Sequence, residues 1–193
     1  MVKEKCQIAI ATLVVAWSAV LHAQVSAGMT IPVTPANFDR AESDMYFSST
    51  VKNGGFGKFH HNREVMPIDK QAVIRANRDT LYSAAIFDVD AGPVTVTMPD
   101  AGNRFMSMMV IDEDQYAPLV FYGAGARTLT KQQIGTRYVM VGIRTFVDPN
   151  AVKDIEQVHA LQDAFFGIDR RNASPGACRQ DLQAAEWQQF AGF

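Results

Sequence analysis

The chain has 193 residues and a formal net charge of −2 at pH 7, from 18 lysine and arginine against 20 aspartate and glutamate residues. A mildly acidic chain argues against binding to nucleic-acid phosphates, which requires clustered basic side chains. The length suffices for one domain with its own hydrophobic core.

The first 27 residues have the organisation of a secretory signal peptide. Lys3 and Lys5 form a basic start, an uncharged and largely apolar run follows from Cys6 to Leu21, and Val25-Ser26-Ala27 supplies the small residues of a cleavage site. We therefore expect an exported protein, periplasmic or secreted, with no membrane span after signal cleavage. A retained N-terminal anchor is the alternative, because the apolar run approaches the roughly 20 residues that span a bilayer.

A helix is predicted from Pro35 to about Val51. Thr34-Pro35 suits an N-cap followed by the first helical position, and Asn53-Gly54-Gly55 ends the helix. Residues 54–70 show no clean period and are interpreted as a long ordered loop.

Strand patterns dominate the middle of the chain and predict strands at residues 80–89, 94–98, 104–111, 117–122 and 137–147. The turn residues at 99–103 favour a hairpin between the second and third of these strands. The third strand is apolar on both faces, so it should be central in its sheet. Thr130-Lys131-Gln132-Gln133 matches a capping box, which predicts one helical turn ending at Gly135.

A second helix should follow Asp148-Pro149 and end at Gly167, with one apolar stripe facing the core. The stripe consists of Val152, Ile155, Val158, Leu161 and Phe165. Residues 168–193 form a polar tail, with a short helix predicted over about 179–190. The tail holds Cys178, the one cysteine after the signal segment, so no intrachain disulfide is expected.

The order helix, strands, helix predicts an α+β fold. We expect mainly an antiparallel β sandwich or jelly-roll-like sheet, with an N-terminal and a C-terminal helix.

The order and spacing of several stretches resemble the bacterial family called domain of unknown function twelve fifty-four. These stretches are Gly54–Phe59 with His61–Glu64, Asn77–Ser83, Asp90–Thr95, Asp100–Met108, Tyr122–Gly125, Ile134–Tyr138, and Val147–Asn150 through Val158–Asp163. The resemblance covers about residues 35–165. It implies an exported envelope protein with a β-rich, jelly-roll-like domain over residues 28–167, and it assigns no catalytic residues.

Full-length relatives in that family carry a second, C-terminal β domain, and the 26 residues after Gly167 are too few to hold it. The resemblance therefore implies that a pocket or oligomer surface shared between two domains would be absent here or supplied by another chain.

The candidate ligand-binding residues are Asn77, Arg78, Asp79 and Tyr82, at the start of the first predicted strand. Arginine offers a planar fork for a carboxylate or sulfate, its neighbours can orient it, and tyrosine adds a donor on an apolar body. The leading hypothesis is a non-catalytic domain that binds a small molecule or assembles, as a homo-oligomer or with a companion domain on another chain. The alternatives are a structural cluster, or a hydrolase-like enzyme that uses these residues with His61 or Asp112.

No metal or cofactor is predicted. His60 and His61 are adjacent on an extended segment and so point in opposite directions, and His159 has no partner at ligand spacing. Asp112-Glu113-Asp114 could supply oxygen ligands to calcium, but it lacks the alternating acidic positions and the glycine of a calcium loop. No serine lies in a Gly-x-Ser-x-Gly elbow, so the sequence does not support an esterase triad.

Overall fold

A computed structural model of the chain describes residues 30–69, 77–169 and 186–187. Its elements, in chain order, are β1 (Thr30–Ile31), α2 (Phe38–Lys52), β2 (His60–His61), β3 (Thr80–Asp88), β4 (Val94–Met98), β5 (Met106–Asp112), β6 (Leu119–Tyr122), β7 (Gly125–Leu129), α3 (Lys131–Ile134), β8 (Tyr138–Phe146), α4 (Val152–Asp163), β9 (Phe166–Asp169) and β10 (Glu186–Trp187). The predicted α+β class with mostly antiparallel strands is confirmed.

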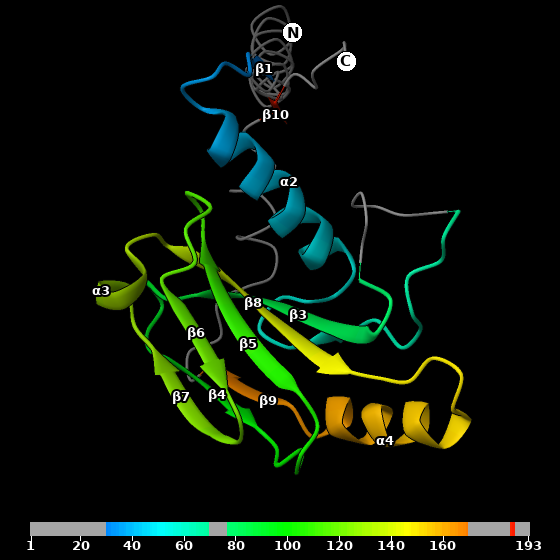
Figure 1. Ribbon diagram of the computed structural model, residues 1–193. Helices are drawn as coiled ribbons and strands as arrows, with labels where there is room; N and C mark the ends of the chain where they lie inside the picture. Colours follow the sequence, from blue (N-terminus) through cyan, green and yellow to red (C-terminus); the bar gives the residue numbers. More distant parts are fainter. Residues whose placement is uncertain (1–29, 70–76, 170–185, 188–193) are drawn as a thin grey trace, which may run out of the picture.

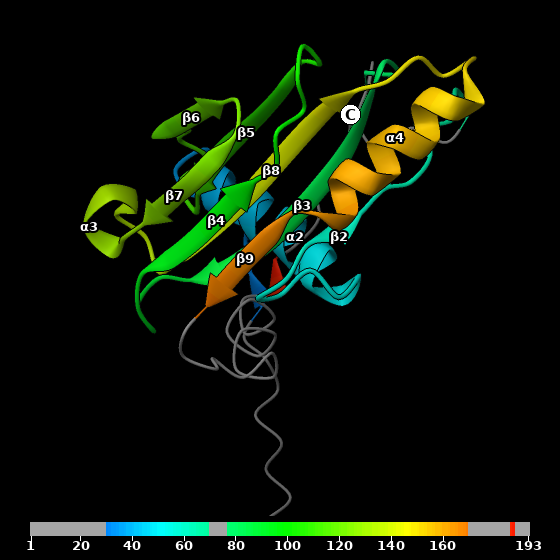
Figure 2. The ribbon, with the colours of Figure 1, turned by 90° about the horizontal axis from the view of Figure 1, so that it is seen from below.

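Two antiparallel sheets face one another (Figures 1 and 2). One has five strands in the order β2-β3-β8-β5-β6, and the other has three in the order β7-β4-β9. The short strands β1 and β10 pair in parallel over two residues. The two larger sheets thus form a sandwich-like arrangement.

The main core lies between these sheets, because alternate residues of each strand point inward. It is built from Ala85, Phe87 and Val89, from Val94, Val96 and Met98, from Met106, Met108 and Val110, and from Leu129, Ile134, Val139, Val141, Ile143 and Phe165. Most of these side chains are fully buried. The sandwich therefore rests on burial of apolar side chains from both sheets.

The predicted hairpin between residues 94–98 and 104–111 is wrong. β4 pairs with β7 and β9, whereas β5 pairs with β8 and β6 in the other sheet, so residues 99–103 carry the chain from one sheet to the other. The central position of β5 is confirmed. Turn residues predict a reversal of direction, but they do not specify which sheet the next strand joins.

β7 was not predicted, because its sequence Gly-Ala-Arg-Thr-Leu has little apolar alternation. It is held in place by pairing with β4 from Val94↔Leu129 to Met98↔Gly125.

α2 begins later than predicted, at Phe38. The Thr34 backbone N–H donates to Asn37 Oδ1 at 2.7 Å, and the Asn37 N–H donates to the Thr34 carbonyl at 3.1 Å, so a turn precedes the helix. The helical turn over residues 131–134 and its capping box are confirmed.

α4 departs from the predicted stripe at both ends. Val158 is fully buried, but Val152 is 70% exposed, and the buried Phe165 lies beyond the last helical residue, Asp163. Gly167 does not end the helix but pairs with Val96 within β9.

Several expectations fall on other parts of the chain. The signal segment 1–27 and Cys178 lie outside the described residues. So does most of the helix predicted over 179–190, of which residues 186–187 are a strand. Within the described ranges, none of the helices combines the length and the apolar character that a membrane span needs.

The two long helices pack on different parts of the five-stranded sheet. Phe47 and Val51 of α2 contact Ile86 and Tyr138, on the sheet face that points away from the three-stranded sheet. Val158 of α4 packs with Leu81 and Val147, which lie at the start of β3 and just after β8.

A fully buried glutamine joins α4 to the sheet. Gln162 Nε2 donates to the carbonyls of Asn62 (3.1 Å) and Tyr82 (3.3 Å) and to Ser83 Oγ (3.2 Å). Buried polar groups of this kind stabilise a fold only while they are hydrogen-bonded.

Replacing Gln162 with leucine should lower the free energy of unfolding by about 1–3 kcal/mol, because the buried Ser83 hydroxyl and the part-buried Asn62 and Tyr82 carbonyls each lose a donor. Urea denaturation of the wild-type and variant proteins measures this difference. The exposed residue Gln132 supplies the control, since Gln132→Leu should change stability by less than about 0.5 kcal/mol. Equal effects of the two substitutions would show that Gln162 does not anchor α4.

Candidate functional site

The five-stranded sheet has one face that packs on the other sheet and one that does not, here called the outer face. Residues paired directly across neighbouring strands lie on the same face, so the register defines rows across the sheet. One of these rows is formed by Ile86, Met140 and Ile111, and α2 packs on its Ile86 and Met140. The rows beyond it are the candidate site.

One of the rows beyond α2 contains an arginine. It lies on the side of the middle of the sheet that is away from α2. This arginine row contains Tyr82 of β3, Arg144 of β8, Ser107 of β5 and Tyr122 of β6, each directly opposite the next. Such partners have Cβ atoms about 4.5–5.5 Å apart. Arg144 is exposed, and the structure shows no hydrogen bond or ion pair from it to another described residue.

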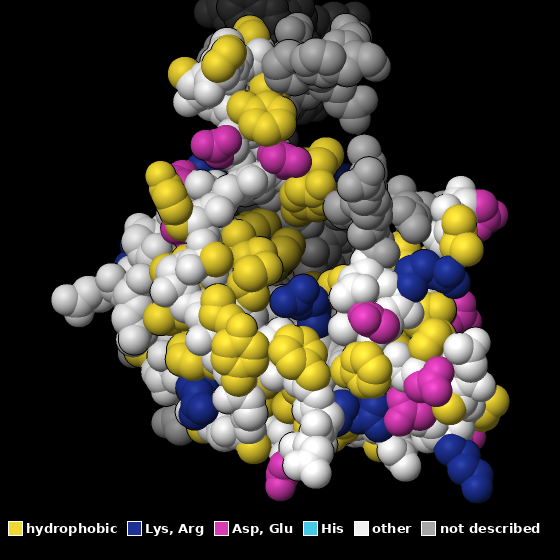
Figure 3. Space-filling view, viewed as in Figure 1, with side chains coloured by type: hydrophobic (Ala, Val, Ile, Leu, Met, Phe, Trp, Pro, Cys, Tyr) yellow, Lys and Arg dark blue, Asp and Glu magenta, His cyan; other side chains and the backbone are white. Residues whose placement is uncertain are grey.

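Aromatic side chains border the arginine row. Phe105, Tyr122 and Phe146 are 47%, 64% and 43% exposed, and the rings of Phe105 and Tyr122 are 6.2 Å apart between centroids. Figure 3 shows hydrophobic side chains gathered over β5, β6 and β8, with a basic side chain among them. Exposed aromatic groups beside an arginine are typical of binding surfaces.

The structure divides the predicted ligand-binding residues into two groups. Tyr82 is half-buried and lies on the outer face opposite Arg144. Asn77, Arg78 and Asp79 are exposed and precede β3, where Arg78 Nε donates to the Met66 carbonyl at 3.0 Å. These three residues thus lie near the end of the arginine row rather than in a buried cluster.

Sequence reasoning missed Arg144. Its one signal is a charged residue inside the apolar strand Val-Gly-Ile-Arg-Thr-Phe, and only the register with β3 shows that it lies beside Tyr82. The neighbouring Thr80 adds a polar group, since it is 4% exposed and its Oγ1 has no hydrogen-bond partner.

The acidic segment after β5 lies at the opposite end of the sheet. Asp112 pairs with Val139, whereas the Asp79 carbonyl accepts from Val147 N–H at 2.8 Å. The eight residue-to-residue steps from 139 to 147 correspond to roughly 26 Å along a strand at about 3.3 Å per residue. Asp112 therefore does not share one site with Asn77, Arg78 and Asp79.

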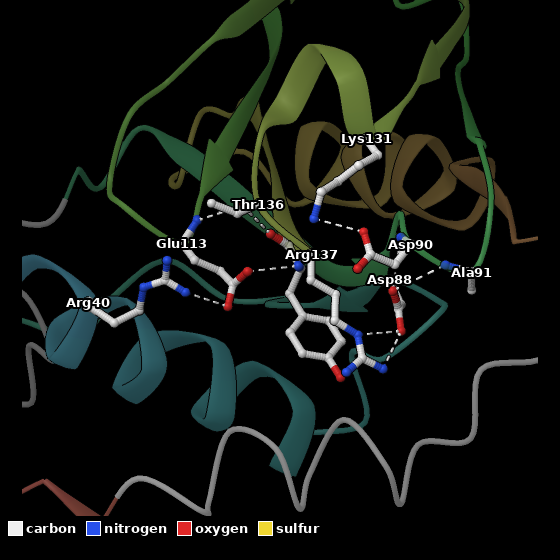
Figure 4. Close-up of polar contacts among 9 residues, drawn as sticks. Arg40, Asp88, Asp90, Ala91, Glu113, Lys131, Thr136 and Arg137 are labelled. Carbon is white, nitrogen blue, oxygen red and sulfur yellow. Dashed lines mark hydrogen bonds and ion pairs between the residues drawn. The ribbon is translucent and has the colours of Figure 1, made fainter.

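The carboxylates of this segment accept hydrogen bonds from other groups of the protein. Asp112 Oδ1 accepts from the backbone N–H groups of Asp114 and Tyr116, each at 2.9 Å. The buried Glu113 accepts from Arg40 of α2 (2.9 Å) and from Tyr138 N–H (3.0 Å), as Figure 4 shows. These contacts attach α2 and the start of β8 to the end of β5.

A similar arrangement holds the turn after β3. Asp88 is buried and accepts from Arg137 Nε at 3.1 Å and from the backbone N–H groups of Asp90 and Ala91 (Figure 4). The arrangement fixes backbone geometry, as expected for a buried carboxylate with several donors.

His61 points to the inner face and contacts a serine. Its Nδ1 lies 2.8 Å from Ser83 Oγ, and its ring packs beside Phe59 and Phe165. His159 instead hydrogen-bonds through Nε2 to the Arg63 carbonyl at 2.7 Å. Within the described part of the chain, no three histidine, cysteine, aspartate or glutamate residues are grouped to hold a metal ion.

Burial lowers the pKa of His61 below its ordinary value of 6.5, and the nearby Arg63 guanidinium acts in the same direction. The neutral form is therefore favoured in the folded protein. Its contribution to stability is complete above the unfolded pKa and is lost as the pH falls from about 6.5 toward the folded value.

The wild-type protein should therefore be less stable in urea at pH 5 than at pH 7.5, and His61→Gln should reduce this pH dependence. Glutamine can still hydrogen-bond Ser83 but does not titrate. Gln132→Asn, which changes an exposed side chain that does not titrate, is the control and should keep the wild-type dependence. Identical pH profiles for wild type and His61→Gln would contradict the assignment.

Comparisons with known proteins concern the fold and part of the sequence. The sequence model of a family described as "Protein of unknown function (DUF1254)" matches residues 56–133, which include Tyr82 but not Arg144. The resemblance is thus confirmed for that stretch. None of the curated proteins matches the chain.

A solved structure shares the fold. The crystal structure of the VPA0106 protein from Vibrio parahaemolyticus has a TM-score of 0.50 and 18% sequence identity, over 72% of this chain and 41% of that one. The chain therefore spans about two fifths of the length of that protein.

Proposed function

We propose that this chain is an exported member of the DUF1254 family whose domain binds a small anionic molecule without catalysing a reaction. The ligand would lie on the outer face of the five-stranded sheet, with its acidic group at Arg144. The family match over residues 56–133 and the signal-like first 27 residues support the family and export.

Arg144 carries the binding proposal. An exposed guanidinium with no ion pair to a described residue has all of its N–H donors available for a planar anion. Tyr82, directly opposite on β3, can add a hydroxyl donor. Arg78 is also exposed near the same end of β3, which adds positive charge for long-range attraction.

A hydrolase-like enzyme is the second candidate, because the contact between His61 and Ser83 has the length of a nucleophile–base hydrogen bond. Ser83 is only 2% exposed, however, and its hydroxyl already accepts from Gln162. A structural role for this pair therefore fits better. The two functions require different residues. Hydrolysis would require His61 and Ser83, whereas anion binding requires Arg144.

Carboxylates or sulfates should raise the thermal unfolding temperature of the mature protein in a concentration-dependent way, because they bind the native state. Arg144→Gln should abolish the shift while leaving the protein folded. Lys153→Gln removes a positive charge from the exposed side of α4 and should leave the shift unchanged. A shift that persists in Arg144→Gln, or a screen without any shift, would contradict the proposal.

Export is tested separately by expressing the full chain in a bacterium and sequencing the N-terminus of the product. Cleavage after Ala27 predicts a periplasmic or secreted protein that begins at Gly28. A product that keeps residues 1–27 and sediments with membranes would instead support the retained anchor.

A further inference from the structure

Gly142 occupies a position where the fold does not require glycine. It lies in the middle of β8 and pairs with Ala84 on one side and Met109 on the other. Its φ is outside the left-handed region, since the positive-φ glycines of the described chain are others. An added Cβ would meet only the Met109 carbonyl oxygen, at 4.0 Å.

A glycine in a strand weakens the sheet, and it often marks a place where a ligand or another backbone approaches closely. At Gly142 the neighbouring protein atoms leave open space above the strand. The outer face therefore has a low point, or floor, at this position, with room for a side chain that glycine does not fill.

The register extends this floor across the sheet. The floor row consists of His60, Ala84, Gly142, Met109 and Val120, each opposite the next, and its central members are the two smallest residues. Ala84, Gly142 and Met109 are all half-buried. The two small residues Ala84 and Gly142 therefore form a low stretch of this row, here called the trough, between the larger side chains of His60 and Met109.

Larger side chains border the trough on β3 and β8. On one side are Ile86 and Met140, which pack with α2. On the other side is the arginine row, about 7 Å away, since same-face neighbours along a strand are two residues apart.

The positive charge beside the trough lies at one of its margins. The described residues of its three rows are apolar or neutral at all positions except Arg144 and the titratable His60, and Arg144 lies at one margin, beside Tyr82. An apolar trough with a single guanidinium at its margin selects a molecule with one acidic end and an apolar body.

We propose that the ligand is an amphipathic carboxylic acid, an inference that rests on the anion-binding function above. Its carboxylate would accept two parallel N–H bonds from Arg144, and its apolar body would lie over Ala84 and Gly142 toward Met109. Tyr82 would donate its hydroxyl to the carboxylate.

The test measures binding to the full mature chain by calorimetry, with decanoate, decanol and acetate below the concentrations at which the chains aggregate. Decanoate should bind at least tenfold more tightly than acetate, because acetate lacks the apolar body. It should also bind at least tenfold more tightly than decanol, which lacks the charge. Arg144→Gln should abolish the advantage of decanoate over decanol.

Gly142→Val fills the trough without removing a polar group. This variant should unfold at the wild-type temperature or higher, since valine favours strands, and it should bind decanoate at least tenfold more weakly while still binding acetate. Thr128→Val, on an exposed position of β7, is the matched control and should bind decanoate normally. Gly142→Ala replaces the valine variant if that protein does not fold, and it should also weaken decanoate binding.

The outcomes separate this inference from the proposed function. If acetate and sulfate bind through Arg144 but decanoate has no advantage, or if filling the trough leaves decanoate binding intact, the inference fails and anion binding stands. If no anion binds through Arg144, both fail. A dimer that excludes decanoate and dissociates on Tyr122→Ser would also overturn the inference, since a second copy would then occupy the face.

Discussion

The antiparallel register between β3 and β8 is the constraint on which the site depends. These strands pair over nine positions, from Thr80↔Phe146 to Asp88↔Tyr138. A slip of one residue would turn every side chain of one strand to the opposite face. Phe87, Val139 and Val141, all fully buried, would then lose their places in the core. Burial of these residues thus fixes the outward position of Arg144 and its alignment with Tyr82.

The contacts of α2 with the same sheet explain why only part of the outer face is covered. α2 packs over Ile86 and Tyr138, and Arg40 attaches the helix to Glu113 beyond the end of β5. Both contacts lie at the end of the sheet away from Asn77. The floor row and the arginine row lie beside the helix and are not covered by it. Small residues lie at their centre and aromatic residues at their margin.

Much of the fold could be predicted from local patterns. The strands at 80–88 and 138–146 follow from long apolar and β-branched runs, and the Thr130 capping box follows from its own spacing. The partner of each strand could not be predicted, because β4 and β5 join different sheets although a dense turn connects them. β7 was missed because its stability comes from pairing with β4 rather than from its own composition.

The candidate site illustrates the same limit. Tyr82 was identified from its position after a polar cluster, whereas Arg144 and Gly142, 60 or more residues later, become neighbours of β3 only through the register. Asp112 was considered for the same site, and the register separates it from Asn77 by the length of the sheet. Sequence patterns identify which residue types are available, and long-range pairing decides which of them meet.

The most direct measurement is a crystal structure of residues 28–193 with bound decanoate. The acyl chain should give density over Gly142, and both carboxylate oxygens should lie about 2.7–2.9 Å from the Arg144 guanidinium nitrogens. Decanoate bound elsewhere, or an Arg144 side chain that pairs with a carboxylate of its own chain instead, would contradict the account.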